Sequence, residues 1–260
     1  MTDASRTALI GHTGFVGGNL DDQADFDDRF NSSNIEEIRH RRYRRVACAG
    51  APGEKWRANE NPGRDEASVR RLADCLADAE IGRLVLVSTV DVYPEPVDVD
   101  EGTPVEASAL HPYGRHRLWL ERFCRDRFPT TIVRLPGLFG PGLKKNVIYD
   151  LLTDQYLDRV SPDSVYQFYD LRRLWSDVER VLGHGWPLVN FATEPVSVAE
   201  LARTAFGRAF ENPDAPDPAR YDVRSRYAGE LGGGDGYMLS RDEVLRDLAR
   251  FVEDRREARP

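Results

Sequence analysis

Short apolar runs alternate with longer amphipathic segments along the first half of the chain. The runs at 7–10, 45–50, 83–88 and 130–135 do not alternate polar with apolar positions, which is typical of strands buried on both faces. Segments 66–79 and 113–128 carry apolar residues at helical spacing. Strands that alternate with helices predict an α/β fold with a doubly wound parallel sheet of the Rossmann type.

The later part of the chain is expected to form a smaller unit. We expect a Rossmann domain over residues 1–142 and a C-terminal region over 143–260, with a strand near 187–191 that returns to the Rossmann sheet. Ser197 is expected to cap a helix that starts beside it. A last amphipathic helix is predicted over 241–253.

Glycines follow the first apolar run at regular spacing, as Gly11, Gly14 and Gly17. Their missing side chains allow a sharp turn, a close approach of the backbone to a pyrophosphate, and tight packing of a helix on a strand. The turn therefore predicts a site for NAD or NADP, with Thr13, Phe15 and Val16 beside the glycines.

The end of the second expected strand, at 26–31, does not decide between the two cofactors. NAD-binding folds usually hold the adenosine ribose there with an acidic residue, whereas this chain offers Asn31 and Ser32. The lack of an acidic residue at this position slightly favours the cofactor with a 2′-phosphate, which is NADP. Asp27 and Asp28 lie so near that a shift of two residues would reverse the inference, so both NAD and NADP stay open.

Composition excludes several classes of function. The formal net charge of −8 and a pI near 5.3 oppose general nucleic-acid binding, because that needs a basic field. No run approaches the roughly 18 apolar residues of a membrane span, and the first residues lack a targeting pattern, so the cytoplasm is the expected location. Cys48, Cys75 and Cys124 have neither disulfide nor metal-site spacing and are expected to be buried.

Three further segments complete a known pattern: 88–94 with Thr89 and Asp91, 113–117 with Tyr113 and Arg117, and the segment 134–142. Together with the glycine turn, they make the chain resemble the extended short-chain dehydrogenase/reductase superfamily, in particular its NAD-dependent epimerase/dehydratase branch, which acts on sugar nucleotides. The resemblance implies that Thr89 and Tyr113 are catalytic, that Tyr113, Arg117, Ala49 and Pro136 also contact the cofactor, and that residues 143–260 bind substrate. It also implies a possible homodimer.

Arg117 departs from the family pattern, which has lysine four residues after the tyrosine. A phenol has a pKa near 10, and lowering it to about 7 requires roughly 4 kcal/mol of preferential stabilisation of the phenolate. Arginine can supply a positive field, but it cannot release a proton at ordinary pH. Two interpretations remain: an active NAD(P)-dependent oxidoreductase or epimerase, or a cofactor-binding regulator without turnover.

Asp91 is a further catalytic candidate. Family dehydratases carry two acidic residues directly after the threonine, but here the first position is Val90, so dehydration by such a pair is not expected. A single carboxylate can still act as a base. The alternative is that Asp91 anchors the turn before Tyr93.

Cations in the later segments are candidates for substrate binding. The chain has only three lysines among its 36 basic residues, and two of them, Lys144 and Lys145, stand together beside Asn146. Compact ammonium groups there suggest a diphosphate or carboxylate partner. With Thr89 and Arg173 they are the expected contacts of a nucleotide sugar, the alternative substrate being a small polar ketone. His116 is expected to face outward from its helix.

Overall fold

The computed structural model describes residues 5–257, which form two compact units. Unit 1 takes the chain up to Glu95, then Thr103–Arg134 and Leu174–Val189. Unit 2 is built from Pro96–Gly102, Leu135–Arg173 and the chain from Asn190 onward. The chain therefore passes between the units several times.

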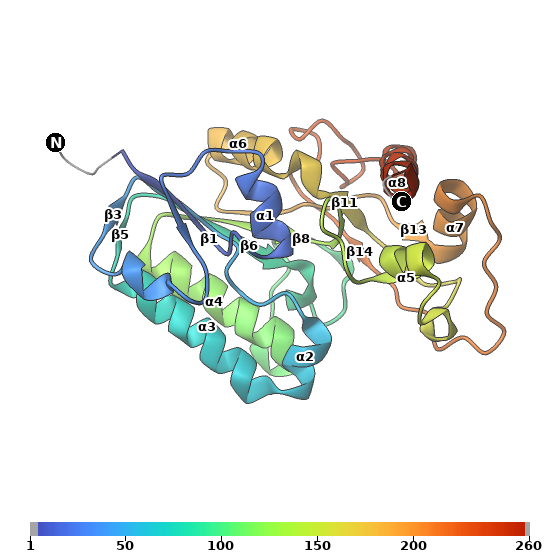
Figure 1. Cartoon of the computed structure of the whole chain (residues 1–260), viewed down its shortest axis with the longest axis horizontal. Coiled ribbons are helices and arrows are strands. Elements are labelled where there is room, and N and C mark those ends of the chain that lie inside the picture. The colour runs from blue at the N-terminus through green and yellow to red at the C-terminus, as the bar shows by residue number, and fades with distance from the viewer. Residues whose placement is uncertain (1–4, 258–260) are drawn as a thin grey trace. The chain divides into compact units, whose positions relative to one another are not determined.

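Unit 1 contains the predicted parallel sheet, whose strands lie in the order β12-β8-β6-β4-β1-β2 (Figure 1). The strand bounds are Thr7–Ile10 for β1, Asp28–Phe30 for β2, Arg45–Cys48 for β4, Leu84–Thr89 for β6, Thr130–Leu135 for β8 and Leu188–Asn190 for β12. β1 pairs in parallel with β2 on one side and β4 on the other. The chain order changes direction between β1 and β4, which makes this the topological switch point of a doubly wound sheet. The predicted Rossmann-type fold is confirmed.

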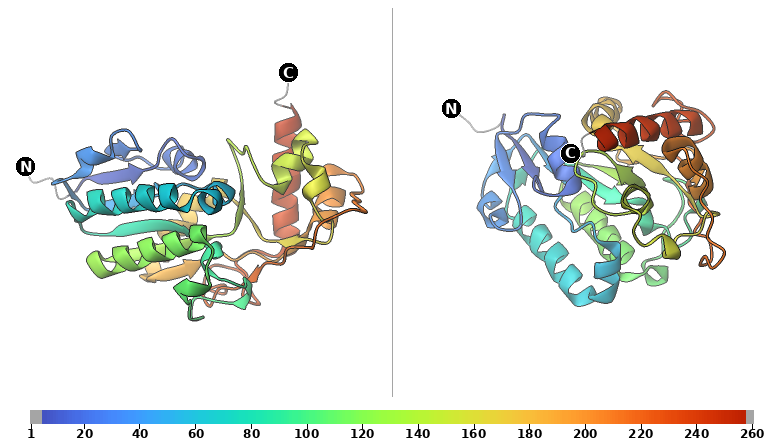
Figure 2. Two further views of the ribbon diagram at one scale, coloured as in Figure 1. Left: turned by 90° about the horizontal axis from the view of Figure 1, so that it is seen from below. Right: turned by 45° about the vertical axis from the view of Figure 1, so that its right-hand side comes forward.

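Helices cover both faces of this sheet. The bounds are Phe15–Asp21 for α1, Lys55–Glu60 for α2, Pro62–Ala77 for α3, Pro112–Arg127 for α4 and Leu174–His184 for α6. Figures 1 and 2 show α3 and α4 side by side on one face, with α1 and α6 on the other. Leu72, Leu76 and Leu120 pack with the strands in one buried core, to which all three cysteines also belong, as expected.

Short elements connect these parts of unit 1. They are the 3₁₀ turns η1 (Ile35–Ile38), η2 (Val90–Val92) and η3 (Ala107–Ala109), and the paired strands β3 (Arg42–Tyr43) and β5 (Glu80–Ile81). Within residues 5–257, no helix combines the length and the apolar character that crossing a bilayer demands.

In the part of the chain that the structure describes, unit 2 contains three pairs of short strands and three helices. The strand pairs are β9 (Gly137–Phe139) with β11 (Phe168–Asp170), β10 (Val165–Tyr166) with β13 (Val196–Ser197), and β7 (Val97–Val99) with β14 (Asp222–Val223). The helices are α5 (Val147–Thr153), α7 (Val198–Phe206) and α8 (Arg241–Glu257), with the 3₁₀ turns η4 (Leu157–Arg159) and η5 (Leu171–Arg173). Ser197 caps α7 as predicted, because its hydroxyl accepts the Glu200 backbone N–H at 3.1 Å.

A buried ion pair joins β8 to α4 in unit 1. Arg134 donates to both oxygens of Glu121, Nε to Oε1 at 3.0 Å and Nη2 to Oε2 at 2.6 Å. Arg134 also donates to the Tyr93 hydroxyl at 2.9 Å, and Ser88 donates to Glu121. Both charged side chains are at most 5% exposed. The network therefore holds the end of β6 and the turn after it against α4.

We predict that Arg134→Met lowers the free energy of unfolding by about 3–5 kcal/mol, because it leaves the Glu121 carboxylate buried without its partner. Arg42→Met is the matched control, since the Arg42–Glu80 pair is exposed at both ends and contributes at most about 1 kcal/mol. Urea unfolding of both variants measures the difference, and equal losses would contradict the structural role of the buried pair.

Candidate active site

The glycine turn lies at the switch point between β1 and β4. Gly11 has a φ of +90°, and a side chain there would meet the Ala49 carbonyl oxygen at 2.4 Å. A Cβ at Gly17 would lie 2.0 Å from the Gly11 carbonyl oxygen. Gly11 and Gly17 are thus required by packing between β1, α1 and the end of β4, where Ala49 follows.

Gly14 has a different environment. It is exposed and caps α1, and a Cβ there would have only the Gly11 carbonyl oxygen within 4 Å, at 3.3 Å. The turn therefore presents bare backbone to open space at the switch point, with Thr13, Phe15 and Val16 beside it. This cradle fits the pyrophosphate of a dinucleotide, and its glycines are the residues that would hold it.

The register of β2 decides the position of the nearby acidic residues. Phe30 lies opposite Ile10, so Asn31 is the residue at the carboxyl end of β2. Asp27 accepts from the Thr7 backbone N–H at 2.6 Å, and Asp28 pairs with Arg6 at 2.6 Å. Both aspartates are therefore engaged at the start of β2, and neither occupies the position of a ribose-binding carboxylate.

Asn31 and Ser32 follow β2 directly. The Asn31 Oδ1 accepts from the Ser33 backbone N–H at 2.8 Å, and its Nδ2 lies 3.3 Å from the His12 Nε2 in the glycine turn. Ser32 is exposed, and its carbonyl accepts from Arg71 at 3.1 Å. The end of β2 is thus polar and carries no acidic side chain.

Thr89 and Tyr113 meet where β6 ends. Thr89 is the last residue of β6 and caps η2, its hydroxyl accepting the Asp91 backbone N–H at 3.1 Å. Tyr113 lies in the first turn of α4 and is only 9% exposed. Gly114 makes this approach possible, because a Cβ there would lie 2.2 Å from the Asp91 carbonyl oxygen. Because Gly114 has no side chain, the first turn of α4 can lie against η2, and Tyr113 comes close to the end of β6.

Arg117 is buried and held by three groups. Its guanidinium carbon lies 4.0 Å from the centre of the Tyr113 ring, one turn earlier on α4. Its Nη1 donates to Asp65 of α3, and its Nη2 donates to the Pro52 carbonyl in the loop before α2. Asp65 also bonds to the His116 Nδ1 at 2.7 Å, so His116 is buried and the expectation that it faces outward is wrong.

A second cation lies close to the tyrosine. The Lys55 Nζ, at the start of α2, donates to the Asp91 Oδ1 at 2.6 Å. Asn59, on the same helix, accepts the Tyr113 backbone N–H at 3.1 Å. Neither residue was among the sequence-predicted site residues. Lys55 could have been found, because it is the third of only three lysines and follows the end of a parallel strand.

Burial dominates the ionisation of Tyr113. Loss of solvent raises the pKa of its hydroxyl, and the Asp91 carboxylate raises it further. The Arg117 charge, a hydrogen bond with the Thr89 side chain and the Lys55 charge all lower the same pKa. The cations thus oppose the cost of forming a phenolate in a dry site.

The remaining predicted residues belong to unit 2. Pro136 is buried beside β9, and Arg173 is half-buried in η5. Lys144 and Lys145 are exposed in the turn after β9. Asn146 caps α5, its Oδ1 accepting the Ile148 backbone N–H at 3.0 Å and its Nδ2 donating to the Leu138 carbonyl at 2.8 Å. The local fold therefore accounts for Asn146 without a ligand.

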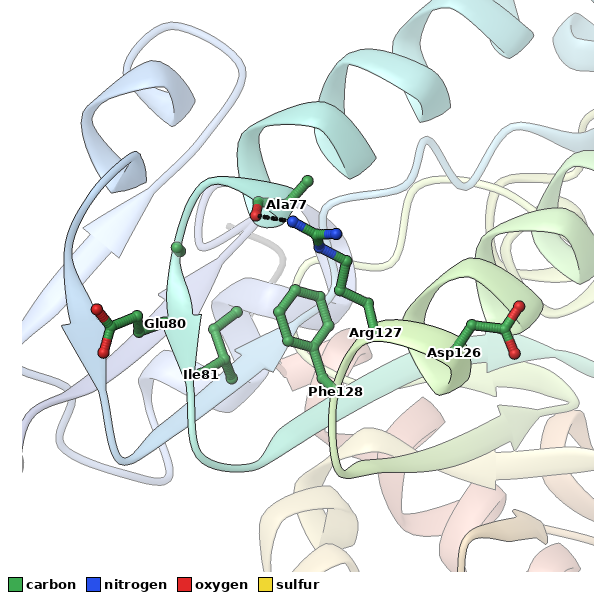
Figure 3. Close-up of a pocket in the computed structure, with 7 residues that line it drawn as sticks. Ala77, Glu80, Ile81, Asp126, Arg127 and Phe128 are labelled. Carbon is green, nitrogen blue, oxygen red and sulfur yellow. Dashed lines mark hydrogen bonds between the residues drawn. The ribbon is translucent and has the colours of Figure 1, made fainter.

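One hollow of unit 1 lies far from Tyr113. Figure 3 shows it between the last turns of α3 and α4 and the strand β5, lined by Ala77, Glu80 and Phe128 among others. Arg127 crosses it and donates to the Ala77 carbonyl at 2.8 Å. Tyr113 lies in the first turn of α4, about 20 Å away along a helix that rises 1.5 Å per residue, so this hollow is not part of the candidate site.

Comparisons with known proteins agree with the fold. Residues 2–178 match the NAD dependent epimerase/dehydratase family. No curated protein matches the chain by sequence.

Solved structures resemble the whole chain at low sequence identity. The dTDP-glucose 4,6-dehydratase of Streptomyces venezuelae, with NAD bound, has a TM-score of 0.74 at 18% identity, over 98% of each chain. The UDP-glucose 4-epimerase of Thermotoga maritima, with UDP-glucose, has 0.69 at 16% identity, over 96% of this chain and 98% of its own. The RMD protein of Pseudomonas aeruginosa, complexed with NADPH, has 0.69 at 18% identity, over 96% and 100%.

We predict that Gly14→Val weakens the binding of NADH and NADPH by about tenfold or more, because a branched side chain would fill the cradle. Gly183→Val is the control: a Cβ at Gly183, on α6, would have no atom of another part of the chain within 4 Å. Titration calorimetry with both cofactors measures the change. An unchanged affinity of Gly14→Val for both cofactors would show that the pyrophosphate lies elsewhere.

A second prediction concerns the choice of cofactor. Asn31→Asp should shift the ratio of NADH to NADPH affinity by about tenfold or more in favour of NADH, since a carboxylate accepts from a ribose hydroxyl and repels a 2′-phosphate. Asn61→Asp adds the same charge at the N-cap of α3, where the side-chain oxygen can still accept the Arg64 backbone N–H, and is the control. The two dissociation constants are measured for each variant, and equal effects of both substitutions would contradict a role of Asn31 at the ribose.

Proposed function

The chain belongs to the NAD-dependent epimerase/dehydratase family, a family of enzymes, and we propose that it oxidises, reduces or epimerises a hydroxyl or ketone carbon of a nucleotide-linked sugar with NAD or NADP. The observation that carries the proposal is the meeting of Thr89 and Tyr113 at the carboxyl end of β6. Ligands of open α/β sheets bind outside the carboxyl ends of the strands. Reacting groups and cofactor would therefore share one edge of the sheet.

Tyr113 would exchange a proton with the substrate oxygen in this reaction. When bound, the nicotinamide supplies the complementary step, the transfer of a hydride to or from the carbon atom. The Thr89 side chain lowers the pKa of the Tyr113 hydroxyl, and Arg117 gives a fixed positive charge over the ring. Both favour the ionised tyrosine, as an acid/base group of this kind requires.

The nucleotide part of the substrate is proposed from two sources. The dehydratase and epimerase named above act on dTDP-glucose and UDP-glucose, so the same fold accepts nucleotide sugars in those proteins. In this chain, Lys144 and Lys145 place two exposed ammonium groups in adjacent positions, which suits a diphosphate. Arg173 would be a further anion contact.

Dehydration fits the site less well than redox or epimerisation. Val90, directly after Thr89, is 3% exposed and cannot serve as an acid. Asp91 remains as a single carboxylate, and it is paired with Lys55. A mechanism that needs an adjacent acid and base therefore lacks one of its two groups.

We predict that Tyr113→Phe reduces hydride transfer by about 10²–10⁴-fold, because only the group that exchanges the proton is removed. Cofactor affinity should stay within about twofold of the parent, since the ring is retained. Tyr43→Phe is the control, because it removes a buried hydroxyl that bonds to Asp28 at the opposite end of the sheet. Absorbance of the reduced nicotinamide is followed with a panel of UDP- and dTDP-sugars and small ketones.

The panel separates the alternatives. Turnover of ketones alone would favour a ketoreductase of small metabolites over the proposed substrate class. Binding of the cofactor without turnover of any compound would contradict the proposed catalytic function and would favour a cofactor-binding regulator. Full turnover by Tyr113→Phe would contradict the role of the tyrosine.

A further inference from the structure

The Lys55–Asp91 pair links two segments that border the tyrosine. The Lys55 Nζ lies 2.6 Å from the Asp91 Oδ1, and the side chains are 39% and 18% exposed. Asp91 belongs to η2, whose backbone the first turn of α4 touches at Gly114. The pair therefore lies beside the first turn of α4, which contains Tyr113.

The short helix α2 holds Lys55 in this position. Lys55 and Asn59 are four residues apart, so they lie on the same face of the helix. Asn59 accepts the Tyr113 backbone N–H at 3.1 Å, and the loop before α2 is fixed by the bond from Arg117 to the Pro52 carbonyl. The segment that supports the tyrosine backbone is thus the segment that supplies the ammonium group.

We infer that Lys55 is a positioning residue for the acid/base chemistry of Tyr113: its ammonium group balances the Asp91 carboxylate, which otherwise would face the tyrosine as an uncompensated negative charge. The inference rests on the proposed function of Tyr113. It assigns separate tasks to the two cations. Arg117 is a buried, fixed charge that joins α4 to its neighbours, whereas Lys55 is a titratable amine at the more exposed side of the site.

Lys55 and Asp91 carry opposite charges, so they shift the pKa of Tyr113 in opposite directions. Asp91 raises this pKa and Lys55 lowers it, and the carboxylate acts on the phenol more strongly than the ammonium group. The charged and titratable groups around Tyr113 come from every packed element and are Lys55, Asp65, Asp91, His111, His116 and Arg117. Burial and Lys55 lower the pKa of His111, so a neutral ring is expected there.

The test compares Lys55→Met, Asp91→Asn, the double variant and Lys55→Arg. Tyrosine labelled with ¹³C at Cζ reports the ionisation of Tyr113 by NMR, in the protein alone and with saturating NAD⁺, and Tyr113→Phe assigns its signal. Lys55→Met should raise the pKa of Tyr113 by about one unit, and Asp91→Asn should lower it. The pKa of Tyr113 in the double variant should lie between those of the two single variants, and Lys55→Arg should restore the charge. Arg57→Met, which removes an exposed cation of the same helix, should have no effect.

The pKa of Tyr113 should shift in opposite directions in Lys55→Met and Asp91→Asn. That result distinguishes an electrostatic role of the Lys55–Asp91 pair from a purely structural one. Each single substitution breaks the same pair, so a purely structural role predicts shifts of the same sign, and that result would overturn the inference. An unchanged titration in Lys55→Met would overturn it too. If Lys55→Met does not fold, Lys55→Gln removes the same charge with a polar side chain and takes its place in the comparison with Asp91→Asn. The titration needs no substrate, so a protein without turnover that shows opposite shifts would contradict the proposed function but not the role of Lys55.

Discussion

The buried charge of Arg117 is the constraint on which the candidate site depends. A guanidinium out of water is stable only with ionic and hydrogen-bonding partners, and here they come from Asp65 on α3 and the Pro52 carbonyl before α2. Satisfying one side chain therefore fixes two other segments against α4. The Tyr113 ring lies directly beneath the same charge, so the contacts that hold the site together also set its electrostatics.

Burial away from water has two opposite effects on the ionisation of Tyr113. Removal of water strengthens every charge interaction, but it also disfavours the phenolate. The structure counters that cost with fixed groups: Arg117 over the ring, Thr89 at the side chain, and Lys55 beside Asp91. Arg117, where the family pattern has lysine, supplies a fixed charge over the ring, and Lys55 adds a second positive charge beside Asp91.

The glycine turn and the position of Tyr113 depend on the same kind of packing constraint. Gly11 and Gly17 allow β1, α1 and the end of β4 to touch through backbone alone, and Gly114 does the same for α4 and η2. A single added carbon atom at any of these positions would overlap a carbonyl oxygen. Because β1, β4 and β6 pair in parallel, their carboxyl ends lie at one edge of the sheet, which is the edge where open α/β sheets bind ligands.

The sequence by itself determined the features that depend on local pattern. Strand and helix positions, the glycine turn and the Ser197 cap follow from spacing, since each is encoded within a few residues, and the short motifs around Thr89 and Tyr113 carry the resemblance to the family. Tertiary structure decided the rest. In the folded chain His116 points inward to Asp65. Asp27 and Asp28 bind Thr7 and Arg6 at the start of β2 and so lie away from its carboxyl end. Asn146 caps a helix. Tertiary structure also brought Lys55 to Asp91 across 36 residues, because strand order alone determines which loop ends become neighbours, and no local pattern encodes that order.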